Sequence, residues 1–140
     1  MSRADGDATT AASSRRDRVK MMGDLARQRE AAESVEAQKL IDDFVRAATA
    51  AGLPVVDLMA TTGGRSVRTN VRGWYLRRDR SIAIGVDGGY YRLSVPAGPL
   101  ARLTGVRVEP SAPPLIVGRG GRDGESGDLK DFLARALAQV

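Results

Sequence analysis

The spacing of apolar residues changes at Gly52, and this change limits the folds open to the chain. Before Gly52, apolar residues recur three and four positions apart, which places them on one face of a helix. They are Ala37, Leu40, Ile41, Phe44, Val45, Ala48 and Ala51. Gly52 followed by Pro54 is typical of a helix C-terminus. After Pro54 the apolar residues alternate with polar ones, which is typical of strands, so the sequence predicts an α+β fold.

The segment after Pro54 predicts an antiparallel meander of five or six short strands. Residues 65–76 and 82–86 alternate between apolar and polar, and Asp87-Gly88-Gly89 is typical of a hairpin turn. Further short strands are predicted at residues 55–60, 91–95, 106–108 and 115–117. Thr61 to Gly64 predicts a turn between the first two strands. Connections this short require antiparallel pairing.

Residues 128–140 predict a C-terminal helix with one apolar face. That face contains Leu129, Phe132, Leu133, Ala136 and Leu137. Asp128 is the expected N-cap residue. Because both helices have one apolar face, we expect them to cover the apolar face of the sheet. The result is a two-layer α+β domain over residues 37–140.

The N-terminal third of the chain differs in composition from this domain. Residues 1–14 contain almost nothing that could be buried, so we expect a disordered tail. Residues 15–36 predict a charged helical extension with a thin apolar stripe formed by Val19, Met22 and Leu25. Two interpretations of this stripe stay open. The helix is either a solvated extension or the binding surface for a partner protein.

Histidine and cysteine are both absent from the sequence. Their absence excludes disulfides, zinc or haem sites that use these residues, and nucleophilic devices of the Ser/His/Asp or Cys/His type. No pair of acidic residues is placed where a cleft is expected. We therefore predict a chain that is not an enzyme and holds no cofactor or metal. There is no long apolar stretch and no secretory leader at the N-terminus, so we expect a cytoplasmic protein without a membrane partner.

Arginine is concentrated between residues 65 and 80. This stretch has six arginines and one aspartate, and its net charge equals the +5 of the whole chain. The arginines are Arg65, Arg68, Arg72, Arg77, Arg78 and Arg80. Arg68, Arg72 and Trp74 alternate along one predicted strand, and arginine beside an aromatic ring is typical of surfaces that bind nucleic acid. The alternative is a solvated sheet face with Trp74 in the core, in a chain whose arginine content reflects a GC-rich genome.

A glycine-rich segment follows the last predicted strand of the meander. Residues 116–122, Ile-Val-Gly-Arg-Gly-Gly-Arg, resemble the G-x-x-G loop of KH domains, which clamps a nucleic-acid backbone at the start of a helix. Arg119 and Arg122 are then candidate contacts. The sequence departs from the KH pattern afterwards, because Gly124 stands where an apolar helical residue is expected. The alternative is a flexible connector between two elements.

Four short segments together are similar to a group of small uncharacterised actinobacterial proteins. They are Ala-Gly-Leu-Pro at residues 51–54, Arg-Gly-Trp-Tyr-Leu at 72–76, Asp-Gly-Gly-Tyr-Tyr at 87–91 and the stretch at 113–126. The resemblance covers about residues 37–140. It implies a bacterial cytoplasmic protein, and it implies no activity, cofactor or site.

Two functional hypotheses follow from these observations. The favoured one is a non-enzymatic accessory module that binds an unidentified protein through the helix at residues 15–36. It is favoured because it requires no specific arrangement of functional side chains. The alternative is binding of nucleic acid, or another anionic partner, through residues 65–80 and the loop at 118–122.

Overall fold

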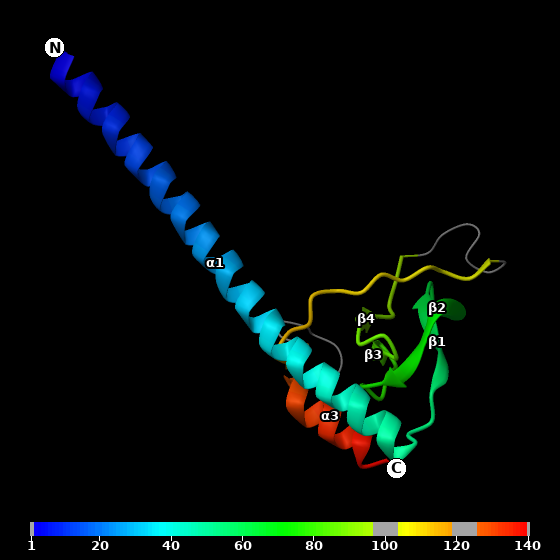
Figure 1. The fold of residues 1–140 in the computed structure, drawn as a ribbon. Coiled ribbons are helices and arrows are strands. Elements are labelled where there is room, and N and C mark those ends of the chain that lie inside the picture. Colours follow the sequence, from blue (N-terminus) through cyan, green and yellow to red (C-terminus); the bar gives the residue numbers. More distant parts are fainter. Residues whose placement is uncertain (1, 97–103, 119–125, 140) are drawn as a thin grey trace. The chain divides into compact units, whose positions relative to one another are not determined.

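A computed structural model describes residues 2–96, 104–118 and 126–139 of the chain (Figure 1). The chain divides into two units, residues 1–33 and residues 34–140. The sequence places the boundary between the charged extension and the domain slightly later, between residues 36 and 37. The two units are described separately below.

The first element, α1, is a helix over Ser2–Ala51. All described residues of the first unit belong to this helix. The structure differs here from the expected disordered tail, because residues 2–14 are helical. The physical reason is local: this stretch has no proline and is rich in alanine, the residue with the highest helix propensity.

The C-terminus of α1 confirms the predicted stop at Gly52. Gly52 has a φ of 72°, a conformation that costs glycine little and other residues more. The backbone N–H of Leu53 donates to the carbonyl of Ala48 at 3.0 Å, and the N–H of Gly52 donates to Thr49 at 3.2 Å. This pair of bonds is the Schellman motif, which satisfies carbonyls left open at the helix end.

An antiparallel four-stranded sheet follows α1, with its strands in sequence order. The strands are β1 (Val56–Thr62), β2 (Arg65–Tyr75), β3 (Ile82–Gly85) and β4 (Tyr90–Arg92). Gly63 and Gly64 connect β1 to β2 with φ angles of 56° and 78°, as a two-residue hairpin with positive φ at both positions requires. Each neighbouring pair of these strands is antiparallel, which confirms the predicted pairing.

The C-terminal part forms a second, two-stranded sheet and a helix. The elements are β5 (Ile116–Val117), β6 (Gly127–Asp128) and α3 (Leu129–Leu137). The α+β class and the C-terminal helix are confirmed. Asp128 is the N-cap residue of α3, but its side chain makes no capping hydrogen bond.

Two predicted strand positions differ from the structure. Residues 106–108 form no strand; Val106 makes only an isolated parallel bridge to Thr69 of β2. Gly105, with a φ of 77°, turns the chain immediately before this bridge. Conversely, Gly127 and Asp128 form the strand β6, which the sequence analysis did not predict, and its backbone pairs with β5.

One core of the second unit lies between the helices and the sheet. Ile41, Phe44 and Ala48 of α1 are buried together with α3 and with one face of the sheet. Trp74 lies at this junction and is 5% exposed. Its indole N–H donates to the carbonyl of Leu53 at 3.1 Å, and its ring meets Phe44 edge-on, with centroids 5.5 Å apart. Trp74 therefore joins the end of α1 to β2.

A second core lies on the opposite face of the same strands. Its buried members are Leu58, Ala60, Val67, Ala83, Tyr91, Leu93 and Val108. The chain after β4 also returns to β1, where the N–H of Thr61 donates to Leu93 at 2.7 Å and the N–H of Val95 donates to Thr61 at 2.9 Å. The sheet thus has apolar side chains on both faces, and the expectation of a single apolar face covered by helices describes only the first core.

Replacing Trp74 by Phe tests the junction between α1 and the sheet. The variant Trp74→Phe leaves the buried carbonyl of Leu53 without its donor and removes part of the ring, so we expect the free energy of unfolding to fall by about 2–3 kcal/mol. Urea denaturation followed by circular dichroism measures this. Val86→Ala, at a side chain that is 49% exposed, is the control. A Trp74→Phe variant as stable as the control would contradict the assignment.

Candidate anion-binding site

The turn between β2 and β3 brings three arginines together. The N–H of Leu76 donates to the carbonyl of Ile82 at 2.9 Å, and the N–H of Arg80 donates to the carbonyl of Arg77 at 3.0 Å. Arg80 has a φ of 60°, the only positive value at a non-glycine residue in the described part of the chain. This left-handed conformation costs an L-residue about 1 kcal/mol. The compact turn holds the backbones of Arg77, Arg78 and Arg80 next to one another.

Asp79, the one acidic residue within this turn, is engaged by its neighbour Ser81. Its Oδ1 accepts hydrogen bonds from the Ser81 N–H at 3.0 Å and from the Ser81 Oγ at 2.6 Å. The Ser81 hydroxyl bond is the largest cause that lowers the pKa of the Asp79 carboxyl, and the charge of Arg77 adds to it. Asp79 is therefore ionised at neutral pH and stabilises the turn.

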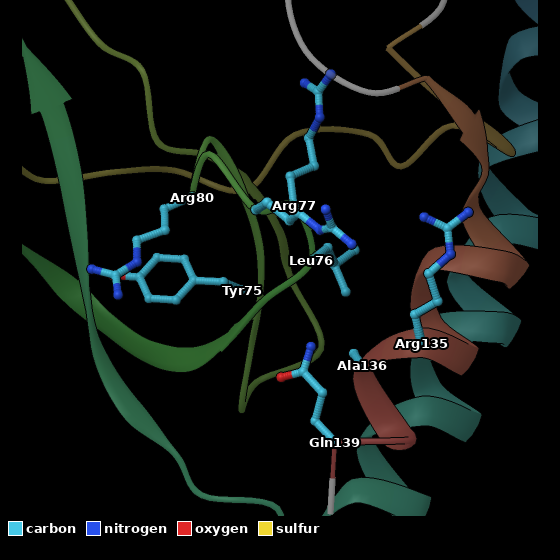
Figure 2. A pocket seen from close by; sticks show the side chains of 8 residues that line it. Tyr75, Leu76, Arg77, Arg80, Arg135, Ala136 and Gln139 are labelled. Atoms are coloured by element: carbon cyan, nitrogen blue, oxygen red, sulfur yellow. The ribbon is translucent and has the colours of Figure 1, made fainter.

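The three arginines line a hollow of about 370 Å³ together with Arg135 of α3. Figure 2 shows Arg80 against Tyr75 on one side of this hollow and Arg135 rising from α3 on the other. The remaining lining is uncharged and consists of Tyr75, Leu76, Ala136 and Gln139. Among the described residues that line the hollow, none is acidic. We call this the arginine hollow.

Aromatic rings hold two of the four guanidinium groups in place. The Arg80 guanidinium lies 5.3 Å from the centroid of the Tyr75 ring, and that of Arg135 lies 5.1 Å from the centroid of Phe132. Arg77 donates from Nη1 to the Ser81 Oγ at 3.3 Å. Guanidinium groups fixed in this way lose little conformational entropy on binding, and their planar donors match phosphate and carboxylate oxygens.

The structure separates the predicted arginine cluster into two groups. Only Arg77, Arg78 and Arg80 line the arginine hollow. Arg65, Arg68 and Arg72 are exposed along β2, outside it. Arg72 pairs with Asp57 on the neighbouring strand, with Nε and Oδ1 3.0 Å apart.

Trp74 is a correction to the predicted site. It alternates with Arg68 and Arg72 along β2, but α1 covers this end of the strand and leaves the indole 5% exposed. A buried indole cannot stack on a base, so the alternative interpretation, with Trp74 in the core, is the one that the structure shows.

The predicted glycine-rich contact lies mostly outside the described residues. Arg119 and Arg122 both fall there. Gly118 is described, and so is the pairing of β5 with β6 on either side of the glycine segment. The segment therefore connects two antiparallel strands, whereas a KH loop leads directly into a helix. The resemblance to the KH loop does not extend to this arrangement.

Arg135 and Gln139 are site residues that the sequence analysis missed. Arg135 lies on α3 and Gln139 lies just after it, and the buried face of α3 includes Ala136, which also lines the arginine hollow. Their sequence pattern indicates only an amphipathic helix. No local pattern relates α3 to the distant turn at residues 77–80, so only the folded core reveals this arrangement.

The predicted partner stripe lies in the first unit. Val19 is 71% exposed, Met22 is 70% exposed and Leu25 is 46% exposed. Met21, beside them, is 62% exposed. These side chains give α1 an apolar surface within residues 19–25.

Comparison with protein-family models, curated proteins and solved structures finds no match to this chain. None of the helices in the described part of the chain has a stretch long and apolar enough to cross a membrane. The same described residues contain no cluster of three or more acidic side chains placed to hold a metal ion.

Proposed function

We propose that the unit at residues 34–140 is a non-enzymatic module that binds an anionic group, a phosphate above all, in the arginine hollow. The observation that supports this proposal is that Arg77, Arg78 and Arg80 line one hollow together with Arg135 from a different element. Each guanidinium carries a fixed positive charge and several N–H donors, and these donors match the oxygens of a phosphate. The arginine hollow is therefore expected to bind an anion more tightly than the net charge of the chain alone would predict.

The chemistry of the lining favours binding over catalysis. Arginine stays protonated at physiological pH, and the other described lining side chains are those of Tyr, Leu, Ala and Gln. General acid–base catalysis is most effective with a group whose pKa lies near the operating pH. The described lining residues offer hydrogen-bond donors and positive charge to a ligand, and they offer no such group.

Phosphate is the anion that this proposal names first, and it has two sources. A small phosphorylated molecule and a nucleic-acid backbone present the same oxygens to the guanidinium groups. If the ligand is a nucleic acid, the arginines contact its phosphate backbone. Because Trp74 is buried, no base stacks on that indole. Binding through exposed charges is also expected to weaken as salt rises.

Removing two hollow arginines tests the proposed function. We expect Arg78→Gln with Arg135→Gln to weaken pyrophosphate binding by at least about tenfold, because two charge-assisted hydrogen-bond donors are lost. The control is Arg68→Gln with Arg107→Gln. Both arginines are exposed and lie outside the lining of the hollow, so this variant removes the same charge elsewhere and is expected to change the affinity less than about twofold. Isothermal titration calorimetry measures both.

The same titration with a short oligothymidylate in place of pyrophosphate distinguishes the two phosphate sources. Tighter binding of the oligonucleotide indicates a nucleic-acid backbone, and tighter binding of pyrophosphate indicates a small molecule. Equal losses in the hollow and control variants would show nonspecific attraction and contradict the site. Absence of binding for both ligands would contradict the proposed function.

A second candidate function is supported by the exposed apolar stripe of the first unit. We propose that Val19, Met22 and Leu25 bind the apolar surface of a partner protein. Exposed apolar side chains grouped on one helix are typical of helix-in-groove recognition. The two proposals concern different units of the chain and are compatible with each other.

Substitution of the stripe by glutamine, a good helix former, tests the second candidate. We expect Val19→Gln with Met22→Gln and Leu25→Gln to abolish capture of the partner in a pull-down while the helix content stays unchanged. Ala31→Gln with Ala32→Gln, at exposed positions of the same helix, is expected to retain the partner. A partner that both variants capture equally would contradict the role of the stripe.

A further inference from the structure

A second hollow, of about 270 Å³, adjoins the arginine hollow. The two share Tyr75, Ala136 and Gln139 as lining residues, so they are neighbours. The residues specific to the second hollow are all apolar: Leu53, Pro54, Val56 and Trp74. We call this the apolar hollow.

The two hollows adjoin each other, but the chemistry of their lining residues differs. Four arginines line one hollow, and aliphatic and aromatic side chains line the other. Val56 is 40% exposed, so part of this apolar surface is open to water and gains free energy when it is covered. A ligand that matches both ends has an anionic group joined to an apolar chain.

We infer that the natural ligand of this site is a small amphiphile, with a phosphate or carboxylate head in the arginine hollow and a short alkyl or acyl chain in the apolar hollow. This inference depends on the proposed function, because the head group is the anion proposed above. Each hollow is close to the lower end of the volumes that small-molecule sites occupy. The charge fixes which end of the ligand enters which hollow.

The apolar hollow has a fixed wall. Trp74 is held by its hydrogen bond to Leu53 and by its contact with Phe44, so the indole does not have to rearrange when a chain binds beside it. Ala136 lines both hollows, and its side chain is only a single methyl group. A preformed site of this kind costs less free energy on binding than one that must be ordered.

The test compares octyl phosphate with methyl phosphate, which have the same head group and differ in chain length. Covering two methylene groups alone is expected to strengthen binding about tenfold, so we expect octyl phosphate to bind at least about tenfold more tightly. Octanoate replaces the phosphate head with a carboxylate and shows which head group is preferred. Octanol keeps the chain without the charge and is expected to bind more weakly than either.

Val56→Thr tests the location of the chain. Threonine keeps the branched shape and puts a hydroxyl in the apolar hollow, so we expect it to reduce the advantage of octyl over methyl phosphate at least about threefold. Val86→Thr, the same change at an exposed valine outside both hollows, is expected to keep the full advantage.

Each outcome of these titrations has a distinct meaning. Equal affinities for octyl and methyl phosphate would overturn the amphiphile inference and leave the anion site standing. An advantage that Val56→Thr does not reduce would overturn the placement of the chain. Octanol binding as tightly as octyl phosphate would overturn the role of the arginines. No binding of either phosphate would contradict the proposed function itself.

Discussion

The hydrogen bond from the Trp74 indole to the Leu53 carbonyl is the contact on which the arrangement of the second unit depends. It fixes β2 against the end of α1, where the Schellman motif has already determined the direction of the chain. Phe44 and the apolar face of α3 pack into the same core. Because the turn at residues 77–80 immediately follows β2, fixing Trp74 also fixes the turn relative to α3.

The proposed site is a consequence of this packing. A turn with three arginines and a helix with one arginine would each be a solvated feature alone. Docked on the same core, they line one hollow. Asp79, the one acidic residue of the turn, accepts hydrogen bonds from Ser81. The four arginines of this hollow are the residues that we propose to bind an anion.

The sequence predicts local features well where one residue type has a strong backbone preference. Gly52 ends α1 as predicted, and the alternating residues of β2 and β3 form the predicted antiparallel strands. The prediction of a stacking role for Trp74 is wrong because alternation assigns a face of the strand but not what covers it. Arg68 and Trp74 share that alternation, yet only the Trp74 end lies beneath α1. The contribution of Arg135 could not be predicted, because it depends on a contact between elements far apart in the chain.

The most direct test of the anion site is an NMR titration that follows the Nε–Hε resonances of the arginine side chains as inorganic phosphate is added. The account predicts that the resonances of Arg77, Arg78, Arg80 and Arg135 shift together and give one dissociation constant, while that of Arg68 stays unchanged. Small shifts spread evenly over all arginines, or a larger shift at Arg68 than at Arg135, would contradict it.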